Sequence, residues 1–228
     1  MHWMCAHVKA AAWFLVWLLF PALVAAEALD GVTLWAKVRE RFPELGLTEG
    51  VEPTVRVATD RTTLQEVLNA AVAEAGEDLI LLDGRSSATW EGTTSVTVTM
   101  ANGGITVVSQ NPETGDFATP VTFKGFGFAA TLSATAPLRL ANFAIVEAKT
   151  APTDVSIRCC AFNFSGTGSV VGSALSVVDC GVTSGMVFAG GVYAANATVS
   201  LYNVTIANTR TTYFGAITAI NSAVTLTH

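Results

Sequence analysis

The sequence predicts an all-β protein whose chain winds as a parallel β-helix, that is, a solenoid. An eight-residue block in the second half carries this prediction, because apolar and variable residues alternate before a final apolar–small–apolar triplet. The block occurs at residues 138–145, 155–162, 175–182 and 199–206, and in part at 224–228. Alternation is typical of a strand with one buried face. Recurrence every 17–25 residues is typical of a solenoid, since one such strand cannot bury its apolar side alone.

Charge and composition change along the chain in a way that fits this prediction. Residues 27–100 contain 19 charged side chains, whereas residues 101–228 contain only 10. The later segment consists mainly of Val, Ala, Thr, Ser, Gly, Asn and Phe, which favour strands and tight turns over helices.

The first 26 residues form a predicted signal peptide. Residues 1–9 contain one charge, Lys9, and residues 10–26 are uncharged and apolar. Val24-Ala25-Ala26 places small residues where a signal peptidase cuts, before Glu27. An uncleaved anchor is the alternative, because 17 apolar residues lie at the short edge of a membrane span. The predicted location is therefore secreted or cell surface.

A lead-in segment, residues 27–54, precedes the β-helix domain, which we assign to residues 55–228. Four apolar residues of the lead-in fall near one helical face, and Pro43 ends that turn. They are Leu34, Trp35, Val38 and Phe42. The sequence thus predicts one short helix, followed by a linker from Gly46 to Pro53.

The β-helix domain is predicted to start with a strand, a helix and a second strand. Residues 54–57 and 79–82 have the composition of short strands. Between them, Thr63-Leu-Gln-Glu66 has the pattern of a capping box with Thr63 as the N-cap. The apolar spacing that follows predicts an amphipathic helix over residues 63–75, closed by Gly76. The first coil of a solenoid exposes its apolar end, so we expect this N-terminal capping helix to lie across that end.

Short strands separated by turn residues follow at 96–100, 105–108 and 121–125, with a protruding loop over residues 111–120. Five phenylalanines are expected to fill the core along the axis: Phe126, Phe128, Phe143, Phe162 and Phe164. One inward column is expected from the residues that hold the same block position: Leu140, Ile157, Val177, Leu201 and Leu226.

A second recurring element links the last two coils, since residues 188–196 align with residues 213–221. With Thr63-Leu-Gln-Glu-Val-Leu68, Asp78-Leu-Ile-Leu-Leu-Asp-Gly84 and the block series, it makes the chain resemble the pectin-lyase-like right-handed parallel β-helix proteins from about residue 54 onward.

Within that group the chain is most similar to the polymorphic outer-membrane-protein-type repeat family. Gly190-Gly191-Val192-Tyr193 and Gly215-Ala216-Ile217 approximate the Gly-Gly-Ala-Ile motif of that family. Its Phe-x-x-Asn motif is not intact here, because Ile206-Ala-Asn208 is shorter. The resemblance implies a right-handed solenoid used for adhesion or display at a cell surface. It also covers polysaccharide lyases, hydrolases and pectin esterases, so the fold does not choose among these functions.

Three cysteines follow the leader: Cys159, Cys160 and Cys180. In the aligned blocks Cys160 and Cys180 hold the same inward position one coil apart. Stacked parallel strands lie about 4.8 Å apart, within the span that a disulfide tolerates, and secretion permits the bond. Cys160–Cys180 is therefore a candidate disulfide, with two stacked free thiols as the equal alternative. Cys159 would point the other way and stay unpaired.

Three sequons make Asn163, Asn196 and Asn203 candidates for N-glycosylation in a eukaryotic secretory pathway. The alternative is structural, because Asn at the corners of coils often serves the backbone. A chain rich in Thr, Ser and Asn also forms such triplets by chance.

No catalytic residue is assigned. Enzymes of this fold need clustered carboxylates, either for Ca²⁺ beside a base or facing one substrate. Asp154, Asp179 and Arg158 are the weak alternative site, and solvation of the outer face is the favoured interpretation of these side chains. His228 is the only histidine after the leader, which nearly excludes a Ser-His-Asp triad. We expect no metal site and no cofactor, with Ca²⁺ relevant only to a lyase.

The predicted function is a secreted or surface-displayed β-helix binding or structural module, adhesin-like and without catalytic activity. The alternative is a fragment of a polysaccharide lyase or hydrolase, and a degenerate relative of such enzymes is a third possibility. After residue 26 the chain has 11 basic and 18 acidic residues, a net charge of −7, which disfavours nucleic acid as a partner.

The expected partner is an extracellular carbohydrate or protein surface, with membrane contact only through the leader or a missing C-terminal region. The last block stops at His228, and a solenoid needs a terminal cap. We therefore expect an incomplete C-terminal end that associates with other molecules.

Overall fold

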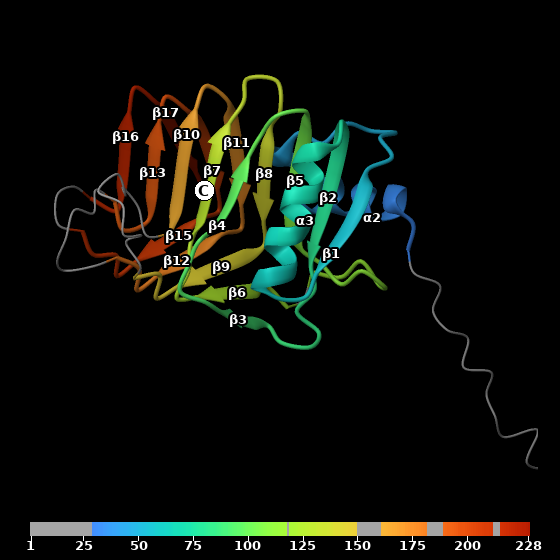
Figure 1. The fold of residues 1–228 in the computed structure, drawn as a ribbon, viewed down its shortest axis with the longest axis horizontal. Helices are drawn as coiled ribbons and strands as arrows, with labels where there is room; N and C mark the ends of the chain where they lie inside the picture. The colour runs from blue at the N-terminus through green and yellow to red at the C-terminus, as the bar shows by residue number, and fades with distance from the viewer. Residues whose placement is uncertain (1–28, 118, 150–160, 182–188, 212–214) are drawn as a thin grey trace, which may run out of the picture.

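The protein is a parallel β-solenoid of about four turns (Figure 1). The computed structural model describes residues 29–117, 119–149, 161–181, 189–211 and 215–228. Three sheets, here called A, B and C, line the solenoid, and all strand pairs between successive coils are parallel. The predicted fold class is therefore confirmed.

The coils run in the order sheet A, sheet B, sheet C. Sheet A contains β1 (Thr54–Ala58), β2 (Gly76–Leu82), β5 (Gly103–Ser109), β8 (Leu138–Ala141), β11 (Ser169–Ser173), β14 (Thr198–Tyr202) and β17 (Ala223–Thr227). Sheet B contains β3 (Thr89–Glu91), β6 (Val121–Lys124), β9 (Phe143–Val146), β12 (Ser176–Val178) and β15 (Thr205–Ala207). Sheet C contains β4 (Val96–Thr99), β7 (Phe128–Leu132), β10 (Phe162–Gly166), β13 (Val192–Ala195) and β16 (Ile217–Ile220).

The register of sheet A shows that most coils are longer than expected. Paired residues at the start of successive strands are Ile105, Leu138, Val170, Val199 and Val224. Only the last of these steps falls within the spacing of the repeated block. Blocks 138–145 and 199–206 each span a sheet A strand, a corner and a sheet B strand, whereas block 175–182 contains only the sheet B strand β12.

The predicted inward column is consequently wrong at Val177. Leu140 pairs with Gly172, and Gly172 with Leu201, which in turn pairs with Leu226. Val177 lies in sheet B between Ile145 and Ile206. A period of two has the same appearance in every sheet, and Gly172 has no side chain to mark its inward position. Ile157 lies outside the described residues.

The corners of the coils need left-handed backbone conformations, and the sequence places suitable residues there. Asn142, Ala174 and Asn203 turn the chain from sheet A to sheet B with φ of 58°, 50° and 51°. Asn tolerates this region better than most residues other than Gly. Corresponding corners after sheets B and C are formed by Gly125, Glu147, Asp179, Asn208, Gly166, Asn196 and Asn221. The backbone ladder continues through them, since the Asn142 N–H donates to the Ser173 carbonyl at 3.1 Å.

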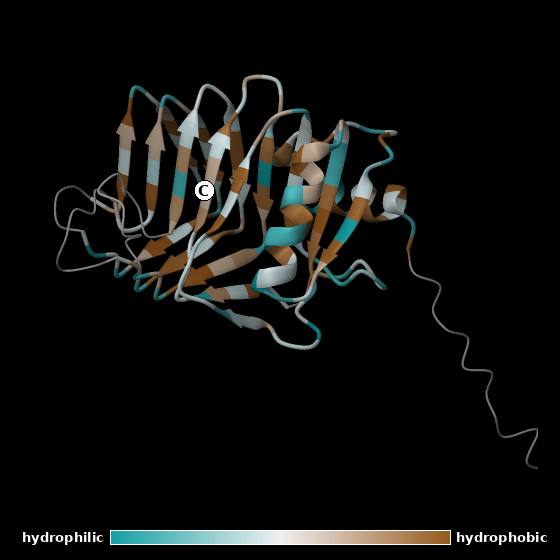
Figure 2. Ribbon diagram, in the orientation of Figure 1, coloured by the Kyte–Doolittle hydropathy of each residue, from teal (hydrophilic) through white to brown (hydrophobic). Residues whose placement is uncertain are grey.

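Aromatic rings run through the interior as expected. Phe123 lies 5.7 Å from Trp90 and 5.0 Å from Phe143, between ring centroids, and Phe143 lies 6.0 Å from Phe162. The five predicted core phenylalanines are all buried. Figure 2 shows apolar residues recurring along the strands of every coil. The core is thus one continuous column along the axis.

The N-terminal end of the solenoid is covered by helix α3 (Arg61–Ala73), as predicted (Figure 1). The predicted N-cap is wrong by three residues. Asp60 is the N-cap, and Thr63 is the third helical residue that completes the capping box with it. Asp is as good an N-cap as Thr. The Asp60–Thr63 pair satisfies the backbone N–H groups of the N-cap and of the third helical residue, as any capping box does. Leu64, Leu68 and Ala71 point into the core and are buried.

The lead-in contains the predicted helix, α2 (Gly31–Arg41), followed by a short 3₁₀ turn at Pro43–Leu45. Its apolar residues pack on the outer face of sheet A, where Leu79, Leu81 and Val108 are buried beneath it. Arg139, on the same face, is also covered. Its Nε donates to the Leu45 carbonyl at 3.1 Å, and it pairs with Glu77 at 2.7 Å. The lead-in is therefore a packed cover of the first coils.

Candidate functional site

The weak alternative site is only partly within the described residues, since Asp154 and Arg158 lie outside them. Asp179 is an exposed corner residue with φ of 55°, one coil above Glu147 with φ of 53°. The Asp179 N–H donates to the Ala207 carbonyl at 3.2 Å. These two carboxylates follow the corner column and are directed to solvent, which fits the structural interpretation of Asp179.

Cys180 is fully buried, and its thiol lies 3.3 Å from the Val178 carbonyl oxygen and 3.6 Å from that of Ile145. Burial raises the pKa of Cys180 to about 11, so the thiol stays protonated and unreactive at neutral pH. Cys159 and Cys160 lie outside the described residues. The Cys160–Cys180 disulfide therefore stays a prediction.

The three sequon asparagines occupy two kinds of position. Asn163 lies half-buried within β10, whereas Asn196 and Asn203 are exposed corner residues with positive φ. Their backbone role is the one that the corner interpretation expects. Glycosylation at all three stays a prediction, and the two exposed corners offer the better access for a glycan.

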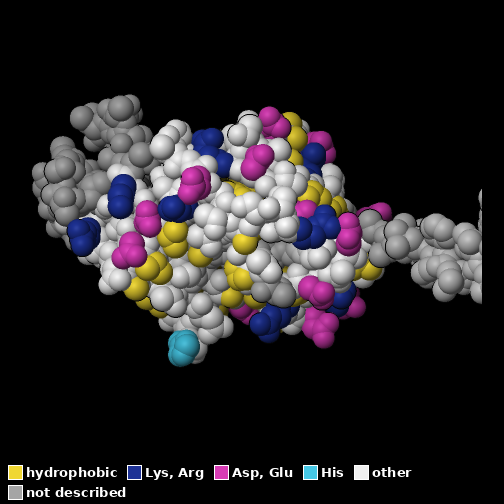
Figure 3. All heavy atoms as spheres, turned by 90° about the horizontal axis from the view of Figure 1, so that it is seen from below, with side chains coloured by type: hydrophobic (Ala, Val, Ile, Leu, Met, Phe, Trp, Pro, Cys, Tyr) yellow, Lys and Arg dark blue, Asp and Glu magenta, His cyan; other side chains and the backbone are white. Residues whose placement is uncertain are grey.

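Charges of both signs are interspersed on the surface around the sheet B side of the molecule (Figure 3). Lys124 pairs with Glu91 across neighbouring coils at 3.1 Å. A group of charged side chains lines a hollow at the ends of β2 and β5. There a cavity of about 160 Å³ is lined by Leu82, Asp83, Gly84, Arg85, Gln110, Asn111, Asp116 and Thr119. We call it the notch.

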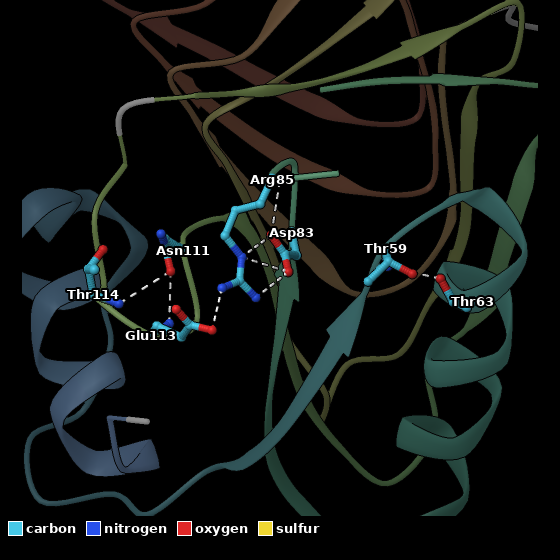
Figure 4. A network of polar contacts seen from close by, with 7 residues as sticks. All are labelled: Thr59, Thr63, Asp83, Arg85, Asn111, Glu113 and Thr114. Atoms are coloured by element: carbon cyan, nitrogen blue, oxygen red, sulfur yellow. Dashed lines mark hydrogen bonds and ion pairs between the residues drawn. The ribbon is translucent and has the colours of Figure 1, made fainter. Parts of the chain in front are cut away.

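An ion-pair network organises the notch (Figure 4). Arg85 forks over the Asp83 carboxylate, with its Nε 2.9 Å from Oδ1 and its Nη2 2.8 Å from Oδ2. Its Nη1 lies 2.5 Å from Glu113 Oε1. Hydrogen bonding to Arg85 lowers the pKa of Asp83, so this nearly buried carboxyl is ionised over the ordinary pH range. Both carboxylates are engaged by one guanidinium, which suits an ordered binding surface better than acid–base chemistry.

The loop over residues 111–120 carries Glu113 back to Arg85. Asn111 Oδ1 accepts the N–H groups of Glu113 at 2.8 Å and Thr114 at 3.2 Å, which fixes a tight turn (Figure 4). Gly115, with φ of 71°, completes the turn. The sequence predicted a protruding loop here, but not this network. An Asn two residues before Glu113 was the available signal, because Asn side chains commonly bind the backbone two residues on.

Gln110 lies beneath the notch with 2% of its surface exposed. Its Nε2 donates to the Gly115 carbonyl at 3.0 Å, while its Oε1 has no hydrogen-bond partner among the described residues. Asn142 of the next coil donates to the carbonyls of Ser109 at 2.9 Å and Phe117 at 3.2 Å, and so ties both ends of the loop to the solenoid. The loop that lines the notch is thus tied to the solenoid by several hydrogen bonds.

Within the described ranges, no group of three or more His, Cys, Asp or Glu residues is arranged to hold a metal ion. The helices of the described part are too short or too polar to cross a membrane. No protein-family model, curated protein or solved structure matches the chain.

Proposed function

We propose that the chain is a secreted or surface-displayed β-solenoid module that binds or supports an extracellular partner and performs no catalysis. The observation that supports this most is a row of small hydroxyl side chains along the outer face of sheet B. The row contains Thr89, Thr122, Ser176 and Thr205, one in each coil except the middle one, which has Ala144 at this position. All four hydroxyl residues are exposed or half-buried.

This row suits recognition for physical reasons. Hydroxyl groups both donate and accept hydrogen bonds, and the short side chains of Thr and Ser lose little entropy when a partner orders them. The coil spacing repeats them along the axis, so an extended carbohydrate or an extracellular protein surface can contact several at once. The notch adds charged groups that are already paired with each other.

We further propose that the chain is related to the pectin-lyase-like proteins and, within them, to the polymorphic outer-membrane-protein-type repeats. The two copies of the glycine motif support this, because they precede paired strands in successive coils, with Val192 opposite Ile217. A Cβ atom on Gly191 would lie 2.8 Å from the Ala216 carbonyl oxygen. The glycine is therefore required where the two coils approach each other.

An array of extracellular glycans and matrix proteins tests the binding function. We expect binding that weakens when Thr122→Val and Thr205→Val remove hydroxyl groups from the row at constant shape. Thr131→Val, on the exposed outer side of sheet C, is the matched control and should leave binding unchanged.

The enzyme alternative is tested on pectin, alginate and related polymers, with and without Ca²⁺. We expect no release of unsaturated or reducing ends. Turnover that disappeared in Asp154→Ala or Asp179→Ala would instead establish a lyase or hydrolase.

A further inference from the structure

The notch combines a cavity with a buried amide oxygen that the described residues leave without a partner. Asp83 and Gln110 directly follow the paired residues Leu82 and Ser109 of β2 and β5, so they occupy the same corner of successive coils. Gln110 lines the cavity and is 2% exposed. Its Nε2 donates to the Gly115 carbonyl, while its Oε1 has no hydrogen bond within the described part of the chain. A buried acceptor without a donor is unfavourable, so this position is suited to a donor group from a ligand.

The size and the lining of the notch suit a single sugar ring. Its volume is about 160 Å³, whereas one water needs about 10–15 Å³ and drug-sized ligands occupy pockets of about 300–1,000 Å³. Six of its eight lining residues have polar or charged side chains, and among the eight only Leu82 has a large apolar one. A sugar ring carries hydrogen-bonding groups around its edge, so it can use most of such a wall.

The charge of the notch favours a positively charged ligand. The carboxylates of Asp83, Glu113 and Asp116 outnumber the one guanidinium of this network by two. That guanidinium, of Arg85, is already engaged by two of them (Figure 4). Asp116 lines the cavity and accepts from Thr114 Oγ1 at 2.8 Å through Oδ2, and a carboxylate has about four acceptor sites in all. Asp116 and the buried amide oxygen therefore offer acceptors to a cationic donor, whose hydrogen bonds are charge-assisted.

The notch also lies close to one end of the row of hydroxyl side chains on sheet B. Thr119 lines the cavity, and Thr122, three residues further on, belongs to the row. Arg85 likewise precedes Thr89, the first member of the row, by four residues. Three or four residues span at most about 10–14 Å, so an extended carbohydrate on the row can reach the notch.

We propose that the notch binds an amino sugar whose amino group is free and positively charged, within a carbohydrate that lies along the hydroxyl row. This assignment, which rests on the binding function proposed above, specifies the class of carbohydrate. The ammonium group donates to Gln110 Oε1 and to the Asp116 carboxylate, and the ring hydroxyls meet the other polar side chains. A lysine side chain has the same charge, but its four-carbon stem would find only Leu82 as an apolar wall. An N-acetylated sugar lacks the charge that Asp116 attracts.

Isothermal titration calorimetry of the full chain with a glucosamine tetramer, an N-acetylglucosamine tetramer and tetralysine tests this assignment. We expect the glucosamine tetramer to bind about tenfold more tightly than either of the others. Asp116→Asn removes one charge from the notch at nearly constant shape and should weaken that binding about tenfold. Glu147→Gln, at the exposed corner after β9, removes the same charge elsewhere and should leave the binding unchanged.

Equal affinities for the charged and the acetylated tetramer, binding of tetralysine that is as tight, or equal effects of Asp116→Asn and Glu147→Gln would overturn the proposal. Equal effects would indicate general attraction of a cation to an acidic protein. Glycan binding that is lost in Thr122→Val and Thr205→Val but unchanged in Asp116→Asn would also overturn it, while the proposed binding function would stand. Binding of the glucosamine tetramer that only Asp116→Asn weakens would support the notch and contradict the role of the row.

Discussion

The first and last described coils of the solenoid differ in how well their outer strands and apolar side chains are covered. At the N-terminal end the Gln65 side chain copies a peptide group: its Nε2 donates to the Thr97 carbonyl at 2.8 Å and its Oε1 accepts the Thr97 N–H at 2.9 Å. The outer edge of β4 is thereby satisfied at Thr97, where β4 has β7 on its other side only. At the C-terminal end Leu226 continues an inward column whose earlier members Leu140 and Leu201 are buried, yet it is itself mostly exposed. The difference shows that a coil is generic, whereas a finished end needs specific side chains.

Stability should consequently be unequal along the axis. An interior coil has neighbours on both sides, whereas the last described coil has one. Since repeat stability is roughly a sum of each coil and its interfaces, an interior coil has more stabilising contacts in this structure than the last described one.

The largest effect is expected for a charge in an interior coil. Val177→Asp would place a carboxylate at a fully buried site between Ile145 and Ile206. An unpaired buried charge costs several kcal/mol, so we expect the surrounding coils to unfold. Circular dichroism during urea unfolding measures this loss of stability. Val178→Asp, on the half-buried outer side of the same strand, should be tolerated far better, and equal losses would refute the assignment of the two faces.

The second prediction compares one substitution at both ends of one inward column. Leu140→Ala should reduce the free energy of unfolding by about 2–5 kcal/mol, because Leu140 is fully buried. Leu226→Ala should cost less than about 1 kcal/mol, because Leu226 is already exposed. Denaturant titration at low protein concentration gives both values. Similar losses would mean that the C-terminal end is as well covered as the interior.

The third prediction tests the seal on β4. Gln65→Ala removes two hydrogen bonds to Thr97, for a loss of about 1–3 kcal/mol. Hydrogen exchange of the Thr97 amide should become faster, with little change at amides of interior strands. Gln65→Glu retains the acceptor and loses the donor, so it should protect the amide better than Ala does. Unchanged exchange in both variants would show that Gln65 does not seal the edge.

The smallest effect on stability is expected when the pH is lowered until Asp83 in the notch becomes protonated. The pKa of Asp83 is lowered in the folded state by Arg85, so this group stabilises the fold above the unfolded pKa of about 4 and loses that contribution as pH falls through the folded value. Arg85 is partly exposed, so the contribution is about 1 kcal/mol or less. Arg85→Ala should make the free energy of unfolding depend less on pH below about pH 4, because Asp83 then lacks the partner that lowers its pKa. Lys124→Ala is the control, since it breaks an exposed ion pair elsewhere.

The sequence predicted regular features well because they depend on local patterns. The apolar period of two predicted the solenoid, and the apolar spacing after Leu64 predicted α3. The column through Val177 was wrong because strands of different sheets share one period, so composition cannot tell which sheet a strand joins.

The notch depends on contacts that no local pattern encodes. Arg85 and Glu113 belong to successive coils, and their pairing depends on a loop whose turn Asn111 fixes. The burial of Arg139 likewise depends on the lead-in, since its carbonyl partner at Leu45 lies far away in the chain. Such residues look like ordinary solvated charges until the coils are stacked.

The position of helix α3 also bears on the order in which the chain is made. A ribosome releases the N-terminal part first, so β1, α3 and β2 emerge before any later strand exists. The sealed end can therefore form early and offer a single growing edge, on which each new coil adds as it appears. Synthesis and winding would proceed in the same direction, away from the sealed N-terminal end.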